Sequence, residues 1–212
     1  MGLVDNKTEF TFSELSPEIQ EKLIQNEAEY IHDYGFDYIS SFITDEFESE
    51  LTQLGISDIE IAWEWFYNQD SGAKFTGSIS GTESIKKFVT NALGLPIFEC
   101  VAETLEISFG SWYKGYFRNP KRDIDSSRLA ASVECDESEV EWLIGTGVNL
   151  KIDVEKVAEK IEREAHTWAI NKANEFYNRL EKSYALHTSH DNIKTHLTNS
   201  DTVYDEFGEV IR

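Results

Sequence analysis

The apolar positions in the first part of the chain follow a helical period. Ser16 and Pro17 form a typical helix start, with serine as the cap and proline in the first turn, where the missing backbone donor costs nothing. The stripe that follows recurs every three or four positions and consists of Ile19, Leu23, Ile24, Ala28 and Ile31. Gly35 interrupts this pattern and is expected to separate the first helix from a second one.

The second helix is expected over residues 36–54, and Gly55 provides its C-terminal stop. Its apolar residues again recur at helical spacing, so we expect them to face the protein interior. The expected inward side chains are Tyr38, Ile39, Phe42, Ile43, Phe47, Leu51 and Leu54.

The middle of the chain shows the period-two alternation of strands. Isoleucine and tryptophan alternate with glutamate and alanine up to a turn over residues 68–72, and a second apolar run follows, which predicts a hairpin. A short helix over 82–93 is expected to end at Gly94. The predicted strands cover residues 59–65, 75–79, 104–109 and 128–133, and the brief alternation over 8–12 is also compatible with a strand.

The clearest helix follows Asp153 and extends to about Lys182, with apolar residues at three- or four-residue spacing throughout. Residues 186–212 are polar and lack strong periodicity. The predicted fold class is therefore α+β, a small antiparallel sheet of about four strands covered by an acidic N-terminal helix pair and one long C-terminal helix. We expect a single domain over residues 1–185, followed by a polar C-terminal tail over 186–212.

Charge changes this picture, because it is concentrated on the expected helix pair. The formal net charge of the chain is -21, and residues 13–64 contain 14 acids against one base, Lys22. Hydrophobic residues make up 40% of the chain and aromatic residues 13%, which excludes a disordered acidic tail. A folded protein tolerates such self-repulsion at a cost in stability, so the negative field is a candidate for the function itself.

The acids of the helix pair have two interpretations. They form either a solvated outer face or a surface that imitates the phosphates of nucleic acid. An acidic protein is repelled by nucleic acid and by anionic membranes, so the expected partner is a basic protein and neither of these. The candidate partner-binding residues are Glu18, Glu21, Glu29, Asp33, Asp37, Asp45, Glu46, Glu48 and Glu50.

An aromatic and basic loop over residues 111–122 is the alternative candidate site. Interleaved rings and cations can stack bases or hold an anion, which would make the protein a nucleotide-binding signal sponge or an unrecognised hydrolase. The competing interpretation is a strand edge whose cations pair with the protein's own acids. The candidate ligand-binding residues are Trp112, Lys114, Arg118 and Arg122.

Known catalytic, cofactor and metal motifs are missing from the sequence. The glycine-containing turns lack P-loop and dinucleotide-binding spacing, and Gly77–Gly81 misplaces the serine of a nucleophile elbow. His187, His190 and His196 are close in sequence but lack the HExxH pattern of zinc hydrolases. We therefore expect no cofactor and no metal, and the missing motifs favour a non-enzymatic protein while leaving the unrecognised hydrolase as the alternative. The long helix over 153–182 has a stripe that suits a core or a homodimer seam.

Three segments of the chain have the form of known sequence motifs. Residues 12–18 match the pattern F-x-E-L-S-x-E, and residues 65–77 are similar to G-F-x-S-Q-G-D-G-A-x-F-x-G, with Gln69–Gly72 departing from Q-G-D-G. Residues 176–189 are similar to Y-x-x-L-E-x-E-Y-x-x-L-T-S, and the tail that follows has an F-D-E-D-G-like run at 204–208. In this order the segments resemble a family of mostly uncharacterised bacteriophage proteins. The resemblance implies a phage origin, a location in the host cytoplasm and an early role against the host. Cys100 and Cys135, expected as free thiols, suit that reducing compartment.

Overall fold

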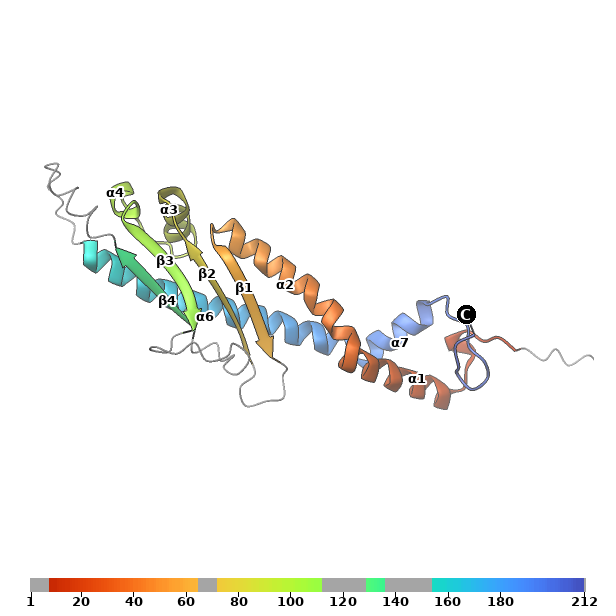
Figure 1. The fold of residues 1–212 in the computed structure, drawn as a ribbon. Helices are drawn as coiled ribbons and strands as arrows, with labels where there is room; N and C mark the ends of the chain where they lie inside the picture. Colours follow the sequence, from red (N-terminus) through yellow and green to blue (C-terminus); the bar gives the residue numbers. More distant parts are fainter. Residues whose placement is uncertain (1–7, 65–71, 112–128, 136–153, 212) are drawn as a thin grey trace, which may run out of the picture. The chain divides into compact units, whose positions relative to one another are not determined.

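The structure, a computed structural model, describes residues 8–64, 72–111, 129–135 and 154–211 (Figure 1). The chain divides into two compact units: residues Met1–Phe42 with Leu180–Arg212, here the helical unit, and residues Ile43–Arg179, here the sheet unit. The elements in chain order are η1 (Phe12–Glu14), α1 (Pro17–Tyr30), η2 (Ile31–Gly35), α2 (Phe36–Gln53), β1 (Ser57–Glu64), β2 (Gly72–Ile79), α3 (Thr82–Asn91), α4 (Glu99–Ala102), β3 (Leu105–Ser111), β4 (Leu129–Cys135), α6 (Val154–His187) and α7 (His190–Asn199).

The sheet unit contains one antiparallel four-stranded sheet with the strand order β1-β2-β3-β4. Ile61 lies opposite Phe75 in the first pair of strands, and Ile107 lies opposite Val133 in the last pair. Side chains alternate between the two faces of a strand, so these apolar residues share one face. The α+β prediction, with four antiparallel strands, an N-terminal helix and a long C-terminal helix, is confirmed.

Aromatic rings fill the space between this face and the helices of the sheet unit. Trp168 of α6 lies 4.9 Å from Phe88 of α3 and 5.7 Å from Phe109 of β3, measured between ring centroids. Phe47 of α2 stacks on Phe176 of α6 at 4.6 Å. Phe75 lies 5.8 Å from the Phe47 ring in edge-to-face geometry. Helices α2, α3 and α6 therefore contribute to one core on the same face of the sheet, and Figure 1 shows α6 passing behind the strands.

The helical unit has a separate and smaller core, which joins α1 to α7. The N-terminal segment and the C-terminal residues also contribute to it, because Phe10 and Tyr204 exchange backbone hydrogen bonds of 2.8 and 2.9 Å. Gly208 closes the unit, with φ 84° and an ideal Cβ position only 2.7 Å from the Ile19 Cγ2, so a side chain there would clash. The buried residues of this core are Phe12, Leu15, Ile24, Ile193, Leu197 and Tyr204.

The second helix begins at Phe36, as predicted, but Gly35 does not break the backbone before it. The φ of Gly35 is not positive, and the chain continues through the π-helical turn η2, where the Phe36 N–H donates to the Ile31 carbonyl. Within the polar stretch after residue 185, α6 continues to His187 and α7 follows, with the Ser189 side chain as its cap at the Asn192 N–H (3.4 Å). The single domain over residues 1–185 stays a prediction.

Candidate functional site

The predicted buried side of α2 is correct at five of its seven positions: Phe47 and Leu51 are buried, and Ile39, Ile43 and Leu54 are half-buried. It is wrong for Tyr38 and Phe42, which are 69% and 54% exposed. Ser40 is buried in this part of the helix, at 4% exposure, and its hydroxyl donates to the Asp37 carbonyl at 3.0 Å. A serine that satisfies its own hydroxyl within the helix can lie on the buried side, which apolar spacing alone does not indicate.

The predicted acids project outward, with one exception. Of the nine candidate residues, Glu50 is half-buried and the others are exposed. Five belong to the helical unit and four to the sheet unit, so they form two acidic groups, one on each unit. The helical-unit group consists of Glu18, Glu21, Glu29, Asp33 and Asp37, and the sheet-unit group of Asp45, Glu46, Glu48 and Glu50.

Glu50 is part of an internal ion-pair cluster of the sheet unit. The Arg179 guanidinium donates to both carboxylate oxygens of Glu50, at 2.6 and 3.2 Å, and to Glu175 at 2.5 Å. Lys172 pairs with Glu175 at 2.8 Å and lies 3.7 Å from Glu50. These bonds raise the pKa of Arg179, chiefly through Glu50, and hydrogen bonds from Lys172 and then Arg179 lower the pKa of Glu175. Two acids and two bases neutralise each other here, so Glu50 adds little to an outward negative field.

Glu21 has a different partner, because its carboxylate lies 3.0 Å from His190 Nε2 at the start of α7. Hydrogen bonding to Glu21, and then to Asp191, raises the pKa of the His190 imidazole above its ordinary value. The pair links α1 to α7 on the surface of the helical unit.

The exposed aromatic residues of the helical unit form a face that sequence reasoning missed. Tyr30, Tyr34, Tyr38 and Phe42 recur every four residues, and the three tyrosines are 58%, 71% and 69% exposed. The rings of Tyr30 and Tyr34 lie 6.1 Å apart, and those of Tyr38 and Phe42 lie 4.9 Å apart in edge-to-face geometry. The signal in the sequence is an acid directly before each tyrosine, in Glu29-Tyr30, Asp33-Tyr34 and Asp37-Tyr38.

The π-helical turn that connects α1 and α2 contacts Tyr184 of α6. His32 Nδ1 lies 2.8 Å from the Tyr184 hydroxyl of α6, within hydrogen-bonding distance. The Tyr184 ring also packs edge-to-face on the buried Phe36 at 5.3 Å. Turns of this kind cost helix stability and are frequent at functional sites, so its place among the exposed tyrosines is informative.

The alternative site lies outside the described residues. Trp112, Lys114, Arg118 and Arg122 all fall within the range 112–128, so the nucleotide-binding interpretation of loop 111–122 stays a prediction.

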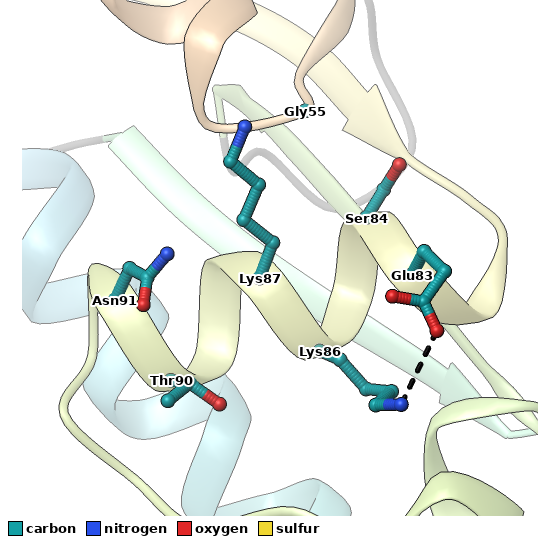
Figure 2. Close-up of a pocket in the computed structure, with 7 residues that line it drawn as sticks. All are labelled: Gly55, Glu83, Ser84, Lys86, Lys87, Thr90 and Asn91. Carbon is teal, nitrogen blue, oxygen red and sulfur yellow. Dashed lines mark hydrogen bonds and ion pairs between the residues drawn. The ribbon is translucent and has the colours of Figure 1, made fainter.

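A shallow depression of the sheet unit, beside the outer side of α3, gathers two lysines (Figure 2). Lys86 already pairs with Glu83 at 3.2 Å and with Glu99 at 3.8 Å, and the Glu83 hydrogen bond raises its pKa. Figure 2 shows the Lys87 ammonium near Gly55, apart from Lys86, so the two cations do not converge on one point. The depression is therefore a poor anion site. Its lining residues are Gly55, Glu83, Ser84, Lys86, Lys87, Thr90 and Asn91.

The three C-terminal histidines do not converge either. His187 Nδ1 lies 2.8 Å from the Ser183 carbonyl oxygen, one turn earlier in α6, and His190 contacts Glu21. In the part of the chain that the structure describes, no three His, Cys, Asp or Glu side chains are arranged to hold a metal ion. None of the helices in the described ranges is both long and apolar enough to cross a membrane.

Comparison with known proteins gives no match: no protein-family model, no curated protein and no solved structure is significantly similar to this chain.

Proposed function

We propose that this protein is a phage-encoded, non-enzymatic inhibitor that acts in the host cytoplasm by binding a basic, nucleic-acid-handling host protein. The expected target is a nuclease, a restriction subunit or another DNA-binding subunit. One observation carries the proposal: the acids of the helical unit project outward. Among the described residues, neither lysine nor arginine pairs with Glu18, Glu21, Glu29, Asp33 or Asp37, and only Glu21 has a histidine partner.

The spacing of these acids supports an imitation of phosphate. An α-helix rises about 1.5 Å per residue, so five acids between Glu18 and Asp37 give about one negative charge per 6 Å. One strand of duplex DNA carries a charge about every 3.4 Å along the axis. The helix therefore presents about half the linear charge of a strand, which is enough to attract a surface shaped for phosphate.

The stability cost of the charge also supports the proposal. Like charges four residues apart on a helix destabilise it by about 0.2–0.5 kcal/mol per pair. Glu29, Asp33 and Asp37 form two such pairs, and no cation among the described residues offsets them. A benefit from binding would explain why the chain keeps them.

The direct test captures the partner with the intact protein from host lysate, with washes at low and then high salt. We expect a basic DNA-binding protein, identified by mass spectrometry, to be retained at low salt and released at high salt, because exposed charge pairs are screened. The purified partner should then lose at least about 100-fold in affinity for the variant Glu29→Lys/Asp33→Lys/Asp37→Lys, through lost attraction and new repulsion.

A matched control separates local charge from net charge. Glu106, Glu159 and Glu206 are exposed and lie outside the two candidate groups. Their triple reversal to lysine changes the net charge equally and should leave most of the affinity. Equal losses for the two variants, or binding that does not weaken with salt, would show that the acidic group of the helical unit is not the binding surface.

A further inference from the structure

The exposed aromatic residues on the acidic helix indicate which class of basic protein the helical unit would bind. The inference drawn from them rests on the function proposed above. The face consists of Tyr30, Tyr34, Tyr38 and Phe42, all in the helical unit. Nine large hydrophobic side chains are exposed among the described residues, and these four fall within a stretch of 13 positions. Simple imitation of phosphate needs acids and no rings, so the rings call for a separate explanation.

The acids and rings alternate in a fixed order. An acid precedes each tyrosine, and the three acid–tyrosine pairs lie four residues apart, one helical turn each. All six side chains are exposed, and no cation of the described residues pairs with Glu29, Asp33 or Asp37. Side chains three positions apart are neighbours on a helix, which brings Asp33 next to Tyr30 and Asp37 next to Tyr34, so carboxylates and phenol rings recur together about every 6 Å along the helix.

The chemistry of a carboxylate beside a phenol ring matches arginine. A guanidinium is planar, stacks on aromatic rings and also donates in parallel to a carboxylate, whereas a lysine ammonium is a strongly hydrated point charge. A tyrosine has only two side-chain torsions, so its ring loses little conformational freedom on binding. The ring contacts of Tyr30 with Tyr34 and of Tyr38 with Phe42 restrict that freedom further before any partner arrives.

The three carboxylates of the aromatic face exclude other classes of partner. A nucleic acid would be repelled by the three carboxylates, and a second copy would bring the same three acids against them. An apolar helix would bury the carboxylates without partners, which is costly. We propose that the aromatic face docks an arginine-bearing helix of the partner protein, with guanidinium groups one helical turn apart, each stacked on a tyrosine and hydrogen-bonded to the neighbouring acid.

The test uses the intact protein and three synthetic alanine-based helical peptides as probes. One peptide carries arginine at positions i, i+4 and i+8, one carries lysine at the same positions, and one carries three arginines on different sides of the helix. Affinities are measured by calorimetry at low salt. We expect the spaced-arginine peptide to bind about tenfold more tightly than the other two, because only its cations meet ring and carboxylate together.

The matched variants remove rings and keep every acid. Tyr30→Leu/Tyr34→Leu/Tyr38→Leu should reduce the affinity for the spaced-arginine peptide to that of the lysine peptide. Phe98→Leu/Phe207→Leu, at exposed aromatic positions of 64% and 67% outside the face, should leave the preference intact. Circular dichroism establishes that both variants keep their helix content.

The outcomes also separate this inference from the proposed function. Equal affinity for the arginine and lysine peptides, or no binding of either, overturns the docking of arginine. A leucine variant that still prefers the spaced-arginine peptide also overturns it. Salt-sensitive capture of a basic host protein by that same leucine variant would leave the acidic-surface proposal standing. Loss of the preference in the leucine variant alone supports the inference.

Discussion

The core of the sheet unit and the aromatic face of the helical unit use aromatic side chains in opposite ways. In the core of the sheet unit, Phe47, Phe75 and Phe176 are almost completely buried, and the Phe47 ring contacts the other two. On the aromatic face, Tyr34 and Tyr38 are about 70% exposed. The acids beside these two regions differ as well, since Glu50 is neutralised by Arg179 and Lys172, whereas no described cation pairs with Asp33 or Asp37. The first region uses its rings and charges for stability, and the second presents them to solvent, as a recognition surface requires.

The largest contrast is expected from removing one ring from each unit. Phe176→Ala empties a fully buried position and should lower the free energy of unfolding by about 3–5 kcal/mol. Tyr34→Ala removes an exposed ring and should change it by less than about 0.5 kcal/mol. Urea denaturation followed by far-ultraviolet circular dichroism measures both. A destabilising Tyr34→Ala would show that the aromatic face packs against the protein itself.

A smaller contrast is expected from reversing one acid in each group. Glu50→Lys brings a third cation between Arg179 and Lys172, and we expect a loss of about 1 kcal/mol, because these side chains are only partly exposed. Asp33→Lys removes repulsion from its helical neighbours Glu29 and Asp37 and should leave stability unchanged or raise it slightly. Thermal melts of the two single variants at equal ionic strength compare them. Equal destabilisation would contradict the difference between the two acid groups.

Acid should weaken the sheet unit through Glu175. Its pKa is lowered in the folded protein, so its contribution to stability is complete above its ordinary value of 4.5 and is lost as the pH falls through the lower folded pKa. The expected loss is below about 1 kcal/mol, since the group is largely hydrated. Between about pH 6 and pH 3, the denaturation midpoint should therefore fall less steeply for Glu175→Gln than for the unmodified protein. The same pH dependence in both proteins would show that Glu175 does not contribute to the loss of stability in acid.

The helical unit should respond to pH in the opposite direction through His190. Its pKa is raised above 6.5, so the stabilisation from the Glu21 pair is complete below 6.5 and is lost as the pH rises through the folded pKa. Nuclear magnetic resonance titration of the imidazole should give a pKa closer to 6.5 in Glu21→Gln, and a smaller decrease in Asp191→Asn. An unchanged pKa in Glu21→Gln would mean that this contact does not hold α7 against α1 in solution.

Sequence reasoning found the elements whose signals are local. The Ser16-Pro17 start is confirmed, because the Ser16 hydroxyl accepts from the Ile19 N–H at 3.4 Å. The antiparallel pairing of the two strands predicted for the hairpin is confirmed by β1 and β2, and residues 65–71 between them lie outside the described residues. Such signals depend only on neighbouring residues, so a single sequence contains them.

Signals that depend on the tertiary environment were missed. Gly35 has a weak helix preference, yet the helix continues through it because Phe36 is buried against Tyr184. Tyr38 and Phe42 are apolar at helical spacing, and only the buried Ser40 reveals that they face outward. Helix α7 is polar overall and buries just Ile193 and Leu197, too few for a pattern. The same limits hid the aromatic face, whereas exposure of the acids could be expected from charge alone.

The π-helical turn contains one residue more than a regular α-helix needs over the same length, so the chain gains a residue without gaining its rotation. In a regular α-helix each residue adds about 100°, and the eight steps from Tyr30 to Tyr38 would turn the two side chains about 80° apart. With one residue absorbed in the turn, the rotation corresponds to about seven regular steps, which leaves an offset of only about 20°. The extra residue thus sets the angular alignment between the two halves of the aromatic face.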